Sequence, residues 1–198
     1  MPALFKSNFD YKLVRAMGAG PYGDRGAVGE CYLTARRIVD GDFESWTVAW
    51  SETAERVERI AHACLSSAHV VSAREAFLRA SCYWRTGCFY LESNDPRHLK
   101  MYEGHRSCFR QAAVLFDPKI EPIKIPYENG KTLPGYFMHA DATGRPRGTL
   151  MILGGGDTTC EELYWGNSCN RARLQRSDCR LARHWPQSIQ RDRFPHGH

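Results

Sequence analysis

The sequence lacks the features of a membrane protein or a secreted disulfide scaffold. No apolar run approaches the roughly 18 to 20 residues that span a bilayer, and residues 1–6 lack the apolar core and cleavage site of a signal peptide. None of the eight cysteines forms a Cys-x-x-Cys pair, and several occupy apolar positions of helical patterns. We therefore expect a soluble, cytoplasmic protein with free, buried thiols and no membrane partner.

The first 164 residues also lack net charge. They hold 20 Lys and Arg against 20 Asp and Glu, whereas residues 165–198 hold 7 Arg against 2 Asp and no Lys or Glu. This tail therefore carries all of the formal charge of +5, and it shows neither a helical nor a strand period. An arginine-rich arm for nucleic acid is one interpretation, but Lys and interleaved aromatic residues are missing, so we expect no nucleic-acid partner.

Four amphipathic helices are predicted before residue 118. Their apolar residues recur at steps of three and four over about residues 24–41, 42–65, 72–91 and 95–116. Three begin with an Asp cap, at Asp24, Asp42 and Asp95, and the third begins with the capping box Ser72-Ala73-Arg74-Glu75. Trp46, Trp50 and Trp84 lie on the apolar stripes and are expected to pack between the helices.

The period changes after residue 118. Alternating residues 122–127 and 132–138, joined by the turn sequence at 128–131, predict a β-hairpin. The continuous apolar run 149–153 predicts a strand buried on both faces, followed by a glycine loop at 154–157 and the start of a helix at 158–164. The expected fold class is an α+β fragment: a helical domain at 1–118, the first strands of an α/β domain at 119–164, and an irregular tail at 165–198.

A family resemblance lies in the order of these motifs. The helices contain "VGECYLTARRI", "GDFESWTVAW" and "VSAREAFLRASCYWRTGCFY", and they precede "IPYENGKTLPGYFMHADATGRPRGTLMILGGGDTTCEELYW". Over about residues 5–164 this resembles the α/β-hydrolases with an N-terminal helical cap, such as 2,6-dihydroxypseudooxynicotine hydrolase-like enzymes and fermentation-respiration switch esterases. The resemblance implies a serine hydrolase acting on a small ester, amide or C–C bond. It also implies that Gly155, Gly156 and Asp157 belong to the oxyanion loop, the alternative being a simple tight turn.

The catalytic residues that this fold requires are missing from the chain. A nucleophilic Ser on a Gly-x-Ser-x-Gly turn should be followed by an acid and a His. The near match around Ser168 ends in Asn170 and follows no apolar strand, and His184, His196 and His198 are interpreted as solvated. We therefore expect no nucleophile, acid or His of a triad, and no activity of the chain alone. The alternative function is a helical module for peptide binding or dimerisation, with a homodimer as a possible partner state.

A change of reading frame would explain the tail. Synonymous codons for residues 165–176, read one base later, give Gly-Ala-Thr-Ala-Ala-Thr-Ala-Arg-Gly-Tyr-Asn, an alanine-rich helix with a glycine stop. The same shift over residues 176–185 gives Val-Arg-Ile-Val-Asp-Leu-Pro-Gly-Ile-Gly, which resembles the family's next strand and loop. The expectation is a frameshift near Tyr164 and a truncated hydrolase.

Neither a cofactor nor a metal is predicted. Residues 18–23 spell Gly-x-Gly-x-x-Gly, but Asp40 ends a predicted helix instead of the second strand of a dinucleotide fold, so a loop that borders the substrate cleft is preferred. His62, His69, His98 and His105 show no paired metal-ligand spacing and are interpreted as structural or surface residues.

Overall fold

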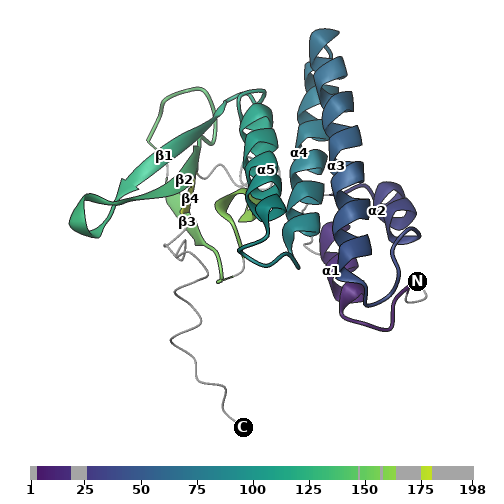
Figure 1. Cartoon of the computed structure of the whole chain (residues 1–198). Helices are drawn as coiled ribbons and strands as arrows, with labels where there is room; N and C mark the ends of the chain where they lie inside the picture. The colour runs from purple at the N-terminus through teal and green to yellow at the C-terminus, as the bar shows by residue number, and fades with distance from the viewer. Residues whose placement is uncertain (1–3, 19–25, 147, 157, 164–174, 180–198) are drawn as a thin grey trace.

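The computed structural model describes residues 4–18, 26–146, 148–156, 158–163 and 175–179, the last range by its backbone only. Its helices are α1 (Phe9–Ala16), α2 (Val28–Ala35), α3 (Phe43–Ser66), α4 (Val70–Cys88) and α5 (Pro96–Ala113). Helix α5 stands between α4 and a small sheet, and α3 lies on the far side of α4 (Figure 1). The predicted α+β organisation is confirmed.

The predicted caps of two helices are confirmed. The Asp42 carboxylate accepts a hydrogen bond from the Glu44 N–H at 2.9 Å, and Asp95 accepts from the Arg97 N–H at 2.8 Å with Pro96 as the first helical residue. Because these capping interactions involve residues within a few positions of the helix start, they can be predicted from the sequence.

The predicted start of the third helix is wrong. Helix α4 begins at Val70 with His69 as its N-cap, so Ser72 lies inside the first turn. The cause is a tight connection from α3, in which the His69 N–H donates to the Cys64 carbonyl at 2.9 Å and Ala68 adopts a φ of 58°. This turn leaves only residues 67–69 between the helices, so α4 has already begun before the predicted capping box at Ser72.

The described residues contain one α-helix more than the four predicted. Helix α1 spans only two turns and buries Phe9, Leu13 and Ala16, a stripe too short for its period to stand out in the sequence. The Phe9 ring packs 4.6 Å from the Trp46 ring, which ties α1 to α3. The helix predicted over 24–41 is shorter, as α2, and its predicted cap Asp24 lies outside the described residues.

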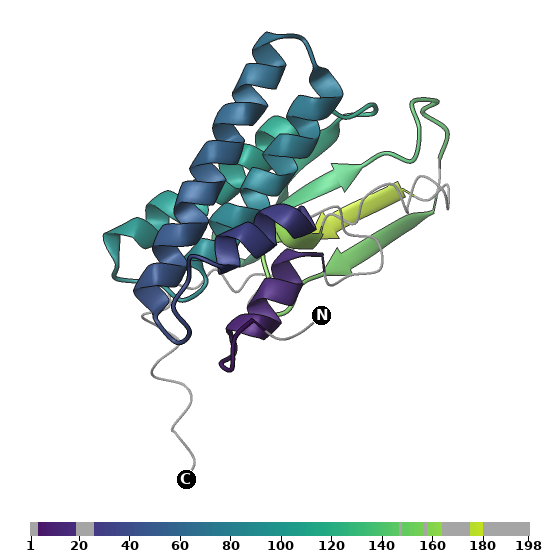
Figure 2. The ribbon, with the colours of Figure 1, turned by 90° about the vertical axis from the view of Figure 1, so that its right-hand side faces the viewer.

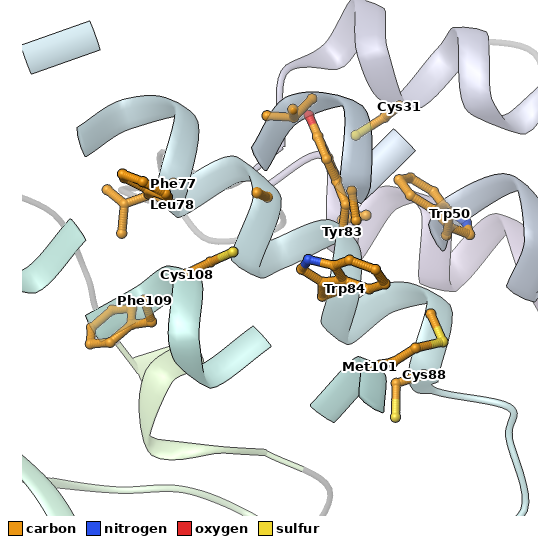
Figure 3. Close-up of a cluster of buried hydrophobic side chains, with 14 of the residues drawn as sticks. Cys31, Trp50, Phe77, Leu78, Tyr83, Trp84, Cys88, Met101, Cys108 and Phe109 are labelled. Atoms are coloured by element: carbon orange, nitrogen blue, oxygen red, sulfur yellow. The ribbon is translucent and has the colours of Figure 1, made fainter. Parts of the chain in front are cut away.

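The core runs between α3, α4 and α5. Trp50 and Tyr83 are fully buried with ring centroids 5.6 Å apart, and Trp84 is 4% exposed (Figure 3). Helices α3 and α4 come close at Gly87, where a Cβ atom would lie 3.0 Å from the Cβ of Trp50. The predicted packing of the tryptophans is confirmed, and the cysteines within residues 26–163 of the described chain all have free thiols.

The sheet has the strand order β1-β2-β4-β3, and its strands lie side by side next to the helices (Figure 2). Strands β1 (Ile120–Pro126) and β2 (Thr132–Met138) form the predicted antiparallel hairpin around the short 3₁₀ turn η1 (Glu128–Gly130). Strand β4 (Gln175–Cys179) pairs antiparallel with β2 and parallel with β3 (Thr149–Leu153). The chain therefore leaves the hairpin, crosses to the sheet edge and returns to fill the position between β2 and β3.

Three expectations about the later elements need correction. Strand β3 is not buried on both faces: Met151 is 60% exposed, because β3 is an edge strand and no described element covers it. The tail contains a strand, β4, because β2 and β3 offer unpaired backbone groups on both sides of one gap. The expected helix start at 158–164 is the single 3₁₀ turn η2 (Cys160–Leu163).

None of the described helices combines the length and the apolar character that crossing a bilayer requires.

Candidate functional site

The glycine loop follows β3 directly, as the sequence predicted. Gly155 and Gly156 are exposed, and within the described part of the chain their N–H groups donate to no acceptor. Asp157, the third predicted loop residue, lies outside the described residues. The loop therefore presents two backbone donors to its surroundings, which is the chemical requirement for holding a developing oxyanion.

The loop is closed by reciprocal hydrogen bonds around η2. The Thr158 N–H donates to the Gly155 carbonyl at 3.3 Å. The Thr159 N–H donates to the Glu162 carboxylate at 2.7 Å, and the Glu162 N–H returns a bond to the Thr159 carbonyl at 3.1 Å. This is half of a capping box, since the Glu side chain satisfies the backbone donor at the start of the turn.

Two arginines from the helices hold the same carboxylate. Arg15 of α1 donates to Glu162 Oε1 at 2.9 Å, and Arg85 of α4 donates to Oε2 at 3.0 Å. Burial by itself would raise the pKa of Glu162, but the guanidinium groups of Arg85 and Arg15 outweigh it and hold that pKa at about 2. Glu162 is therefore ionised at neutral pH and anchors the loop to the helical part.

His105 of α5 forms a second buried link to η2. Its Nδ1 lies 2.9 Å from the Ser81 carbonyl oxygen, and its Nε2 lies 2.8 Å from Thr159 Oγ1. Burial lowers the pKa of His105, so the neutral ring donates through Nδ1–H and accepts from the Thr159 hydroxyl at Nε2. The sequence interpretation of His105 as a structural residue agrees with this arrangement.

Glu161, next to the anchoring glutamate, is only partly satisfied. It is 5% exposed, and its Oε1 accepts from the Tyr136 hydroxyl at 3.0 Å with Arg106 Nε at 3.6 Å. Its Oε2 lies 3.8 Å from His105 Nε2 and has no hydrogen-bond partner in the part of the chain that the structure describes. A buried carboxylate oxygen without a donor is unusual, because leaving such an atom unpaired costs about 1 to 3 kcal/mol or more.

A cavity of about 50 Å³ lies at this junction of α1, α4, α5 and η2. Leu78 and Phe109 form apolar walls from adjacent helices (Figure 3), and Ser81, His105 and Glu161 contribute polar atoms. This cavity was not predicted from the sequence. The adjacent acids Glu161 and Glu162 after a glycine loop were the available signal, but their arginine and histidine partners lie far away in the sequence.

Several residues weighed in the sequence analysis lie outside the described residues. They are Ser168, His184, His196, His198 and most of the segment 18–23. Within the described ranges, no group of three or more His, Cys, Asp or Glu side chains could hold a metal ion.

Comparisons with known proteins agree with this architecture. No protein-family model matches the chain. The chain is 39% identical over 160 residues to the alpha/beta hydrolase pydG of an Acremonium species, covering 79% of the chain and 37% of that protein. It is 36% identical over 172 residues to the 20-hydroxy-prefusarin hydrolase of Gibberella moniliformis, covering 83% of the chain and 41% of that protein.

A solved structure shows the same fold. The crystal structure of 2,6-dihydroxy-pseudo-oxynicotine hydrolase superposes with a TM-score of 0.67 at 20% identity, covering 84% of this chain and 44% of that one. The helical region, the sheet and these relatives define the class as an α/β-hydrolase with an N-terminal helical cap. The chain is thus similar to proteins named α/β-hydrolases, and it spans about two fifths of the length of the curated relatives it matches.

Proposed function

We propose that the chain supplies the helical cap and the oxyanion loop of a serine hydrolase that acts on a small-molecule ester, amide or C–C bond. The observation that carries the proposal is the pair of N–H groups at Gly155 and Gly156 that find no acceptor among the described residues, in a loop that Glu162 anchors to the helices. Fixed backbone donors of this kind stabilise the negative oxygen of a tetrahedral intermediate without reorganising during the reaction.

The nucleophile, the acid and the His are not part of this proposal. A loop that only stabilises an oxyanion cannot attack a carbonyl, so the 198-residue chain by itself should be inactive. This role needs no cofactor, since acyl transfer in this fold uses only side chains and backbone donors.

We also propose that residues 165–198 are read out of frame. The match to the 20-hydroxy-prefusarin hydrolase leaves about a sixth of the chain uncovered, which is similar in size to this segment. Strand β4 occupies Gln175–Cys179, and the shifted reading supplies Val-Arg-Ile-Val at residues 176–179, a sequence suited to a strand. The free thiols of the described residues support a reducing, cytoplasmic setting for the protein.

Hydrolysis of 4-nitrophenyl acetate tests the proposal. The 198-residue chain should not exceed a buffer control, whereas the product with the frame restored after codon 164 should hydrolyse the ester. In the restored protein, Gly156→Pro removes the backbone donor and should lower kcat about 100-fold or more. Gly156→Ala keeps the N–H, and a Cβ there meets nothing within 4 Å, so it is the matched control.

The possible failures are separable. A restored protein without hydrolysis would contradict the proposed reaction. Equal activity of Gly156→Pro and Gly156→Ala would show instead that this N–H does not serve the oxyanion.

A further inference from the structure

Glu161, whose Oε2 lacks a hydrogen-bond partner among the described residues, lines the cavity between α1, α4, α5 and η2. Three buried polar side-chain atoms of the described residues have no hydrogen-bond partner, namely Trp50 Nε1, Tyr90 OH and Glu161 Oε2. Of these three residues, only Glu161 lines the cavity. Its side chain is 2% exposed, so solvent at the surface does not satisfy the oxygen.

The other polar groups around the cavity already have partners. His105 uses both ring nitrogens, toward Ser81 and Thr159. Glu162 is bound by Arg15 and Arg85. Among the described acceptors at this cavity, Glu161 Oε2 is therefore the atom that still lacks a hydrogen-bond donor.

Charge and wall chemistry define the ligand that would supply the donor. A cationic ligand would be repelled by Arg15, Arg85 and Lys12, and an anionic ligand would be repelled by the Glu161 carboxylate. The remaining walls, Leu78 and Phe109 among them, are apolar. An uncharged molecule with a hydroxyl group on a hydrocarbon body satisfies all of these conditions.

We propose that this cavity binds the hydroxyl end of a neutral ligand, with the O–H donating to Glu161 Oε2 and the hydrocarbon part lying against Leu78 and Phe109. The binding itself is independent of catalysis, but its role as a subsite for the hydrolase substrate rests on the proposed function. About 50 Å³ holds a hydroxyl and one or two carbon atoms, so the rest of a larger ligand extends out of the cavity past half-buried Phe89 and Lys12, which also line it.

A matched pair of fluorinated probes tests the binding on the 198-residue chain. 4-Fluorobenzyl alcohol and 4-fluorotoluene differ by one hydroxyl, and ¹⁹F NMR titration gives both dissociation constants. We expect the alcohol to bind about tenfold more tightly, as one hydrogen bond to a buried carboxylate predicts. Equal affinities, or no binding of either probe, would overturn the proposal and leave a cavity that holds only water.

Substitution of Glu161 identifies the acceptor. In Glu161→Gln the amide oxygen keeps the Tyr136 bond and the NH₂ group faces the cavity, so the preference for the alcohol should fall to twofold or less. Glu55→Gln makes the same chemical change at an exposed position of α3 and should keep the full preference. An unchanged preference in Glu161→Gln would also overturn the proposal.

A second variant keeps the test decisive if Glu161→Gln does not fold. Leu78→Phe fills the cavity from its apolar wall and should abolish binding of both probes, while circular dichroism verifies the helices. Retained binding in a folded Leu78→Phe protein would place the probes elsewhere. None of these measurements involves hydrolysis, so they fail or succeed independently of the proposed reaction.

Discussion

Arg85 donates from Nε to the Glu162 carboxylate at 3.0 Å, across 77 residues of sequence. Arg15 reaches the same carboxylate from α1, and both contacts are largely buried. The position of the glycine loop therefore depends on the packing of α1 and α4 as well as on β3. The helical part and the start of the sheet consequently behave as one unit around this carboxylate.

Removing the charge of Glu162 should destabilise the fold. Glu162→Gln removes the charge that Arg15 and Arg85 share in a largely buried contact, and the expected loss in the free energy of unfolding is about 3 kcal/mol. Urea unfolding followed by circular dichroism measures it. The control is Glu52→Gln, whose ion pair with Arg37 is exposed on both sides and should contribute less than about 1 kcal/mol.

The same carboxylate should make stability fall in acid. The pKa of Glu162 is about 2 in the folded protein against 4.5 ordinarily, so the unfolded chain binds its proton first as the pH falls. The stabilisation is complete above about pH 5 and is lost as the pH falls toward 2. Urea unfolding at pH 6, 4.5 and 3 should therefore show the gap between wild type and Glu162→Gln narrowing. A gap that stays constant would contradict the assignment.

Local signals made part of the fold predictable. The Asp42 and Asp95 caps and the hairpin turn at 128–131 act within a few residues, and the structure confirms each. Helix α1 and the start of α4 were missed because a short stripe and a tight interhelical turn carry weak sequence signals. Local chemistry thus predicts where an element forms better than where it begins.

The site was predicted only in its local part. The glycine loop at 154–156 follows from its place after an apolar strand, and the structure puts it there. The clamp on Glu162 joins residues 147 and 77 positions apart, which no spacing rule reveals in a single sequence. The prediction that β3 is buried on both faces was wrong. A continuous apolar run indicates that a strand is suited to burial, but it does not show which elements of this chain cover the strand.

The edge strand β3 should promote self-association. Leu150, Met151 and Leu153 are each more than 40% exposed on a strand at the end of the sheet order. Met151→Lys places a charge there and should lower aggregation several-fold, measured by light scattering at rising concentration. Val48→Lys changes an exposed apolar residue on α3 and should have a much smaller effect. If the two substitutions lowered aggregation equally, the cause would be the hydrophobicity of the surface in general and not the edge strand β3.

Two glycines near α2 should respond in opposite directions to alanine. A Cβ at Gly26 would lie 2.6 Å from the Ala16 carbonyl oxygen and 2.6 Å from Cys31 Sγ, so Gly26→Ala forces α1 and α2 apart and should cost about 2 kcal/mol.

Gly29 is the matched control for this substitution. It lies in α2, and a Cβ there meets nothing within 4 Å, so Gly29→Ala should raise stability by about 0.5 kcal/mol through its better helix propensity. Urea unfolding of the two variants under one condition measures both effects. The backbone oxygen of Ala16 cannot move away from a new Cβ unless α1 moves with it. A Gly26→Ala protein as stable as wild type would therefore show that α1 and α2 do not pack as closely as in this structure.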